Sequence, residues 1–121
     1  MKTFKDIIAW QKGYELTLAI YRESKLFPRD EEFGLKSQMR RAAASIIFNI
    51  AEGFKRHRPD DRNRFYNFAS ASLEELKCQT MLAKDLGYFS GPLFERLFAE
   101  EDEVSRILYG WMQSQQKPHH T

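Results

Sequence analysis

The most regular feature of the sequence is the recurrence of apolar residues every three or four positions in four long segments. This spacing is typical of amphipathic helices, because positions i, i+3, i+4 and i+7 share one face. Glycine and proline separate the segments at "LFPRDEEFG", "GFKRHRPDD" and "LGYFSGP". No segment alternates apolar and polar residues for long enough to indicate a strand. The pattern therefore predicts an all-α fold with four helices.

The first two segments differ in the side chains of their predicted core faces. The first face is rich in aromatic residues and consists of Ile7, Trp10, Tyr14, Leu18 and Tyr21. The second segment follows "PRDEE", whose acidic residues suit the positive end of a helix. Its core face is mainly aliphatic and consists of Leu35, Met39, Ala42, Ile46, Ile50 and Phe54.

Capping residues mark the ends of the last two segments. Pro59 stands where a first-turn proline is tolerated, Gly87 suits the end of the third helix, and Ser90 suits the start of the fourth. The expected core face of the third segment is Phe65, Ala69, Leu73, Leu76, Ala83 and Leu86. The expected core face of the fourth is Leu93, Leu97, Val104, Leu108 and Trp111.

The lengths of the segments and of their connections predict the architecture. Each segment has roughly 20 residues, which corresponds to a helix of about 30 Å, and short connections favour antiparallel neighbours. We therefore expect an up-down-up-down four-helix bundle. A chain of 121 residues, 42% of them hydrophobic, suits one core. We expect a single domain over residues 1–115 and a flexible polar tail over residues 116–121.

The second predicted helix has an unusual outer side. Ala44, Phe48 and Ala51 lie opposite its core face, where the helix of a monomeric bundle normally carries charged residues. A helix that is apolar or small over most of its circumference is usually covered on both sides. These residues therefore indicate a subunit interface. A central helix screened by long neighbouring side chains is the alternative.

A polar strip follows one edge of the core face of the same helix. Its members are Gln38, Arg41, Ser45, Asn49, Glu52 and Arg56, and the candidates for a polar network among them are Gln38, Ser45, Asn49 and Glu52. A buried amide must find hydrogen-bond partners, and Glu52 can pair with Arg56 one turn later. We interpret the strip as a structural polar network rather than a catalytic site.

No motif for catalysis or metal binding occurs in the chain. No glutamate precedes a histidine by three positions, as a dinuclear metal site in a bundle requires, and nucleophile and phosphate-loop motifs are missing. The three histidines are His57, His119 and His120, and the single Cys78 cannot form an internal disulfide. We expect no enzyme activity, no metal and no cofactor. Without a long apolar run or signal-peptide pattern, we expect a cytoplasmic protein with no membrane partner.

Charge is distributed unevenly, although the net charge is only +2. Residues 36–64 carry eight basic and three acidic side chains, a net charge of +5, and residues 74–103 carry three basic and eight acidic ones, a net charge of −5. The densest cluster, which we call the basic turn, joins the second and third segments. It consists of Lys55, Arg56, Arg58, Arg62 and Arg64.

The basic turn suggests a nucleic-acid interface. The planar guanidinium of arginine suits phosphate oxygens. Arg40 and Arg41 add positive charge towards the other end of the second helix. Asp60 and Asp61 partly neutralise the turn. A second use is also open: the acidic run from Glu100 to Glu103 could meet the basic turn of a neighbouring subunit, and such head-to-tail contacts close into rings.

A longer pattern connects these features to a known family. The segment "FPRDEEFGLKSQMRRAAASIIFNIAEG", followed by "FYNFASASLEEL" and "LGY", resembles the bacterial four-helix proteins encoded in intervening sequences of large-subunit ribosomal RNA. The resemblance covers residues 4–111. That family is similar in fold to the accessory variability determinant of diversity-generating retroelements, which acts with a reverse transcriptase. Matching positions are Gln38, Arg40, Arg41, Ser45, Asn49, Glu52 and Gly53.

The resemblance implies a homopentameric ring of four-helix protomers, favours binding of nucleic acid, and implies no catalytic activity. For the matching positions it implies roles in packing, oligomer contacts and surface charge. Our leading hypothesis is a non-enzymatic, oligomeric nucleic-acid-binding protein that assists an RNA-linked process or a reverse transcriptase. The alternative is a homo-oligomeric protein-interaction scaffold that binds no nucleic acid.

Overall fold

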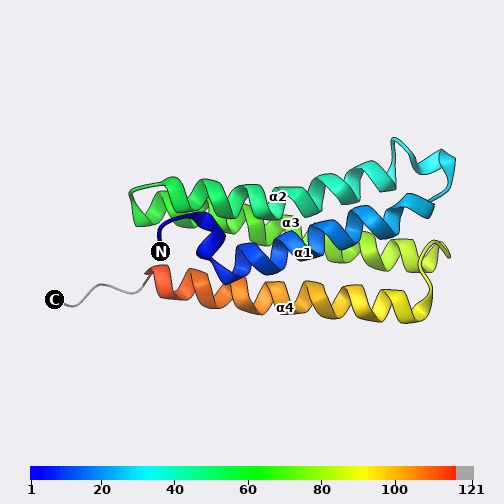
Figure 1. Ribbon diagram of the computed structural model, residues 1–121. Helices are drawn as coiled ribbons and strands as arrows, with labels where there is room; N and C mark the ends of the chain where they lie inside the picture. The colour runs from blue at the N-terminus through cyan, green and yellow to red at the C-terminus, as the bar shows by residue number, and fades with distance from the viewer. Residues whose placement is uncertain (117–121) are drawn as a thin grey trace.

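The computed structural model describes residues 1–116, and these residues form helices without any strand (Figure 1). The prediction of an all-α fold with four long helices is confirmed. The α-helices are α1 (Ile8–Glu23), α2 (Leu35–Lys55), α3 (Pro59–Asp85) and α4 (Gly91–Gln116). Short 3-10 helices precede and follow α1, namely η1 (Phe4–Asp6), η2 (Ser24–Leu26) and η3 (Arg29–Glu31).

The four α-helices lie lengthwise beside one another in Figure 1. Each consecutive pair packs together, and α4 also packs against α1, so the helices enclose one core. The α1–α2 and α3–α4 connections lie at one end of the molecule. The α2–α3 turn lies at the other end, beside the N-terminus. This placement separates the basic turn from the α1–α2 connection by the length of a helix.

The predicted caps of α3 and α4 are confirmed. Gly87 has a φ of 81°, in the left-handed region that favours glycine, and the N–H of Tyr88 donates to the carbonyl of Ala83 at 2.8 Å. At the start of α4, the hydroxyl of Ser90 accepts a hydrogen bond from the N–H of Leu93 at 3.2 Å. These two residues therefore end one helix and begin the next, as their sequence positions indicate.

The predicted core face of the first segment is only partly correct, since Ile7 is buried and Trp10 packs against the core, but the rest of the face is not. Tyr14, Leu18 and Tyr21 are exposed, whereas the buried face carries smaller residues on average: Ala9, Gly13, Leu16, Thr17, Ala19 and Ile20. Close packing against α2 explains the difference. A Cβ atom on Gly13 would lie 3.0 Å from Ile47 Cγ2, so this face lets the two helices approach. Both faces of α1 have helical spacing, and the small residues decided which one is buried.

The core faces of the other helices agree better with the periodicity. Their central aliphatic positions are buried as predicted: Leu35, Met39, Ala42, Ile46, Ile50, Ala69, Leu73, Leu76, Ala83, Leu97, Val104 and Leu108. Phe54, Phe65, Leu93 and Trp111 are half-buried, and Leu86 is exposed, contrary to the prediction. The deviations occur towards helix ends, where fewer neighbouring helices cover a side chain.

The predicted tail begins one residue inside α4, because Gln116 is the last residue of that helix. The rest of the predicted tail, residues 117–121, lies outside the described residues. Within residues 1–116, no helix is both long and apolar enough to cross a membrane.

Candidate nucleic-acid interface

The basic turn brings together the end of α2 and the start of α3. Helix α2 ends at Lys55, and α3 begins at Pro59, so only three residues connect two long helices. Pro59 occupies the first helical turn, where a missing N–H breaks no hydrogen bond, and Asp60 and Asp61 place negative charge at the positive end of α3. The tight connection therefore presents basic side chains from both helices at one end of the bundle.

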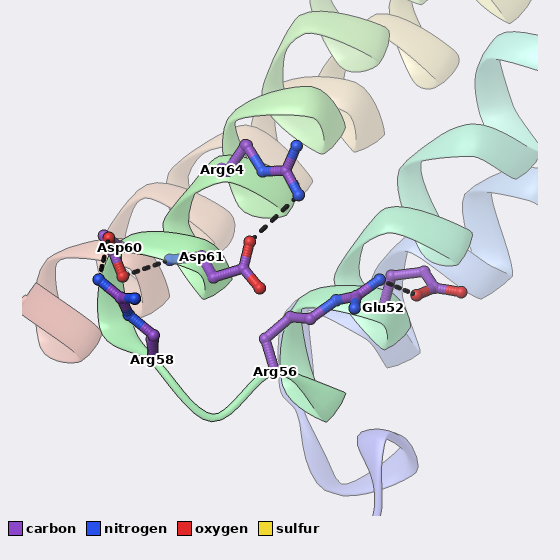
Figure 2. Close-up of polar contacts among 6 residues, drawn as sticks. All are labelled: Glu52, Arg56, Arg58, Asp60, Asp61 and Arg64. Atoms are coloured by element: carbon purple, nitrogen blue, oxygen red, sulfur yellow. Dashed lines mark hydrogen bonds and ion pairs between the residues drawn. The ribbon is translucent and has the colours of Figure 1, made fainter.

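Three arginines of the basic turn form ion pairs with nearby carboxylates (Figure 2). The distances are 3.0 Å for Arg56 Nη2 to Glu52 Oε2, 3.2 Å for Arg58 Nη2 to Asp60 Oδ2, and 3.1 Å for Arg64 Nη2 to Asp61 Oδ1. The side chains of Arg58 and Arg64 are 79% and 59% exposed. Exposed pairs of this kind are worth about 0–1 kcal/mol and are screened by salt. A phosphate group can therefore compete with these carboxylates.

An aromatic ring organises two of these arginines. The guanidinium carbons of Arg56 and Arg64 lie 4.5 and 4.9 Å from the ring centroid of Phe65, within the range of cation–π contacts. Phe65 thus connects the residue that follows α2 to the first turns of α3 beside the charged surface. Its helical spacing predicted a core position only. Phe65 follows Arg56 by nine positions, across the turn, so helical periodicity could not predict this contact.

Arg62 has a structural role within the turn. Its Nη1 donates to the backbone carbonyls of Arg56 and His57, both at 3.1 Å. These carbonyls follow the end of α2 and have no partner within a helix, so the guanidinium caps the chain reversal. Arg62 is less available for phosphate than Arg58 or Arg64.

Arg40 belongs to the opposite end of the molecule. Its Nη2 donates to the carbonyl of Tyr21 at 2.8 Å, its Nε donates to Ser24 Oγ at 2.9 Å, and its guanidinium carbon lies 4.8 Å from the ring centroid of Tyr21. This arginine therefore fixes the end of α1 against α2. The structure does not bring it together with the basic turn.

Arg41 and Lys55 are exposed on α2, and within residues 1–116 neither has a carboxylate at ion-pair distance. Lys55 adjoins the basic turn. Arg41 precedes Arg56 by 15 residues, which is about 22 Å along a helix. The seven predicted nucleic-acid-binding residues therefore divide into one compact group at the α2–α3 turn, namely Lys55, Arg56, Arg58, Arg62 and Arg64, and two distant residues.

The predicted polar strip is only partly a network. Ser45 Oγ lies 2.8 Å from Ser72 Oγ of α3, and the amide Nδ2 of Asn49 donates to Ser45 O at 2.8 Å and to Ser45 Oγ at 2.9 Å. This chain of contacts ties α2 to α3. Gln38 is exposed and makes no such contact, and Glu52 pairs with Arg56 at the basic turn instead. Ser72 is the partner that sequence reasoning missed.

Gly53 permits a close approach beside the basic turn. A Cβ atom at this position would lie 2.5 Å from Tyr66 Cε1 and 3.1 Å from the carbonyl oxygen of Arg62. Tyr66 is completely buried, so its ring cannot move aside easily. The glycine thus sets how near α3 comes to the end of α2.

The outer side of α2 is apolar, as its sequence indicates. Phe48 is 64% exposed, and Ala44 and Ala51 are half-buried. Helix α1, which packs against α2, also exposes large apolar side chains, among them Tyr14 and Leu18. Two adjacent helices therefore present unburied apolar groups.

The acidic run on α4 is mostly occupied by contacts within the protein. Glu101 is buried, Asp102 Oδ1 lies 3.1 Å from Lys77 Nζ of α3, and Glu103 Oε1 lies 3.8 Å from Lys12 Nζ of α1. These contacts join α4 to both of its neighbours. The side chains of Asp102 and Glu103 nevertheless remain 44% and 48% exposed, so only Glu101 of the run is withdrawn from the surface.

Residues 1–116 contain no group of three or more His, Cys, Asp or Glu side chains arranged to hold a metal ion. His57 is exposed in the basic turn, and His119 and His120 lie outside the described residues. At the basic turn the gathered polar side chains are arginines with carboxylates, and guanidinium groups suit binding of anions.

Comparison with known proteins identifies the family. A model of the 23S rRNA-intervening sequence protein family matches residues 5–110. No curated protein is significantly similar in sequence. The fold is similar to that of a crystal structure of a protein with unknown function from the S23 ribosomal protein family of Bacteroides thetaiotaomicron VPI-5482, with a TM-score of 0.80 and 22% identity, over 87% of this chain and 98% of that chain. Because the family model matches most of its length, the chain belongs to the 23S rRNA-intervening sequence protein family.

Proposed function

We propose that this protein is a non-enzymatic, homo-oligomeric accessory protein that binds the backbone of RNA or DNA through its basic turn. The observation that carries the proposal is the gathering of Lys55, Arg56, Arg58 and Arg64 at one end of the bundle, where the pairs of the arginines with carboxylates are exposed and weak. Arginine forks aimed at solvent can exchange a carboxylate for a phosphate.

Binding of this kind involves the phosphates of the nucleic-acid backbone and not the bases. Each cation that neutralises a phosphate releases a counterion, so affinity falls steeply as salt rises. One protomer offers only a few such contacts. The proposed assembly is a homopentameric ring of up-down-up-down bundles, as the family resemblance implies. Five copies of the basic turn would strengthen binding by multivalency without a new contact.

The test is to remove the exposed charges while leaving the structural arginine in place. A Lys55→Ala/Arg58→Ala/Arg64→Ala variant should bind a single-stranded RNA of about 20 nucleotides at least tenfold more weakly in fluorescence anisotropy at low salt. Its salt slope should fall by roughly 0.7 for each phosphate that the variant no longer neutralises. The matched control is Arg22→Ala/Lys25→Ala/Arg29→Ala, which removes three charges from the other end of the bundle (Figure 1).

Equal loss of affinity in both triple variants would mean that net charge alone attracts RNA. Unchanged affinity in the basic-turn variant would contradict the proposal, as would a parent protein whose RNA binding does not depend on salt. The same assay with single-stranded and double-stranded DNA would define the class of nucleic acid. We propose a cytoplasmic location and a reverse transcriptase as the protein partner, which co-purification of the two proteins would test.

The alternative function is a homo-oligomeric scaffold, and the exposed apolar side of α2 is the observation that favours it. Phe48 lies between Ala44 and Ala51, whose small side chains let another helix come close. A Phe48→Asp variant should dissociate the oligomer in light scattering with mass determination. If this variant also keeps full RNA affinity, the basic turn acts independently of assembly. If the parent protein is monomeric, the predicted subunit interface at Ala44, Phe48 and Ala51 is wrong.

A further inference from the structure

A carboxyl group lies in the apolar core between α3 and α4. Glu101 occupies the core face of α4 together with Leu97, Val104 and Leu108, and its exposed fraction is 0%. Its neighbour across the helix interface is Thr80 of α3, which is also completely buried. An ionised carboxylate at such a position would lose its hydration almost entirely, which is very unfavourable without a compensating cation.

The hydrogen bonds around Thr80 indicate where a proton lies. Thr80 Oγ1 is 2.9 Å from the carbonyl oxygen of Leu76 and 2.6 Å from Glu101 Oε2. A hydroxyl group has one hydrogen and can donate it to only one of these oxygens. The Leu76 carbonyl has no hydrogen to offer. If Thr80 donates to Leu76, the contact of 2.6 Å therefore needs a hydrogen on Glu101.

The second carboxyl oxygen gives a further indication. Glu101 Oε1 is buried and has no hydrogen-bond partner among residues 1–116. A carboxylate would leave a full share of negative charge on this oxygen, whereas a neutral acid leaves only a carbonyl oxygen, which is far less costly to bury. Both oxygens of Glu101 are therefore better accommodated when the group is protonated.

We infer that Glu101 is a neutral carboxylic acid in the folded protein, that it donates its proton to Thr80, and that folding takes up this proton at neutral pH. Glu101 and Thr80 then form a proton-dependent tie between α4 and α3. The tie makes the stability of the bundle sensitive to pH in the neutral range. It lies in the core and does not depend on the proposed binding of nucleic acid.

The surrounding charges are consistent with this state. Burial raises the pKa of Glu101 from 4.5 to about 8. The hydrogen bond with Thr80 and the charge of Lys77, both of α3, oppose the rise, and Asp102 and Glu100 of α4 reinforce it. Among residues 1–116, no charged group of α1 or α2 is among the groups that shift this pKa. Lys77 is itself occupied by Glu74 and Asp102 at 3.3 and 3.1 Å. It therefore does not lie in an ion pair with Glu101.

The sign of the pH effect follows from proton linkage. Below pH 4.5 the folded and unfolded chains both hold the proton, and the contribution of Glu101 to stability is fully present. Between pH 4.5 and about 8 the unfolded chain releases the proton and the folded chain keeps it. The unfolded state is therefore favoured progressively as pH rises, until the folded protein also ionises.

The experiment compares the parent protein with a Glu101→Gln variant, whose amide can donate to Thr80 but cannot titrate. Urea unfolding at pH 5.5 and pH 8 should show that the unfolding equilibrium constant of the parent rises on the order of a hundredfold more than that of the variant. All other groups are common to the parent and the variant, so their effect cancels in this comparison. Glu95→Gln is the control for an exposed glutamate of α4 that does not act on Glu101, and it should follow the parent. Equal pH dependence of parent and Glu101→Gln would overturn the inference.

A direct measurement covers the case in which Glu101→Gln does not fold. The infrared spectrum of the parent at pH 7 should contain the carbonyl band of a protonated carboxyl group, and this band should shift in a Thr80→Val variant because the proton loses its acceptor. An absent band at pH 7, or a band unchanged by Thr80→Val, would contradict the inference.

Discussion

The basic turn and the core contact of Thr80 with Glu101 use ionisable side chains in opposite ways. At the basic turn, exposed arginines stay charged in water and exchange partners at little cost. In the core, the carboxyl group of Glu101 is completely buried, and we infer that it loses its charge instead of exchanging partners. Burial, rather than residue type, therefore decides whether an ionisable group in this bundle stays hydrated or must be accommodated in the core.

The largest expected effect concerns the buried member of this comparison. Glu101→Ala removes the core tie and leaves a cavity, so we expect a loss of about 3 kcal/mol in the free energy of unfolding at pH 5.5, measured by urea denaturation. Glu52→Ala, an exposed glutamate in an ion pair, should change it by less than about 0.5 kcal/mol. Similar losses of unfolding free energy in the two variants would contradict the expected difference between a buried and an exposed glutamate.

An intermediate effect on the free energy of unfolding is expected for substitutions within the basic turn. Arg62→Ala deletes two hydrogen bonds from a charged donor to backbone carbonyls, which should lower the free energy of unfolding by about 1.5 kcal/mol. Arg58→Ala should leave it within about 0.5 kcal/mol, because that side chain is exposed and pairs only with Asp60. The comparison would fail if Arg58→Ala were the more destabilising of the two in thermal or urea unfolding.

The smallest expected effect concerns the affinity of the basic turn for RNA. Glu52→Gln removes the carboxylate that competes for Arg56, so RNA affinity should rise about twofold to fivefold at low salt, and the gain should disappear at high salt. Glu15→Gln is a control with the same charge change on α1. An equal gain in both variants, measured by anisotropy, would show that only net charge matters.

Much of the fold could be predicted from apolar spacing and from caps. Gly87 and Ser90 act locally, through a left-handed turn and a capping hydroxyl, so their roles could be recognised from neighbouring residues alone. The core face of α1 could not, because Tyr14 and Leu18 have the same helical spacing as Leu16 and Ile20. The close packing of Gly13 against Ile47 selected the second set, and that contact joins residues 34 positions apart.

The position of the basic turn in the chain could be predicted, but the contacts of its residues could not. The cluster of arginines beside Pro59 located the basic turn correctly in the chain. It could not show that Arg62 would cap backbone carbonyls, that Arg40 would fix the end of α1, or that Phe65 would lie beside two guanidinium groups. Those contacts depend on how two helix ends meet, which periodicity does not encode.

By itself, the sequence determined four helices, the turns between them and the uneven distribution of charge, because helix periodicity, capping and charge are local properties. Tertiary structure alone decided which charges are available. It paired the acidic run of α4 with Lys77 and Lys12, and it buried Glu101 at the α3–α4 interface. The reason is physical: the energy of a charged group depends on the water and partners around it, and only packing of distant segments determines these.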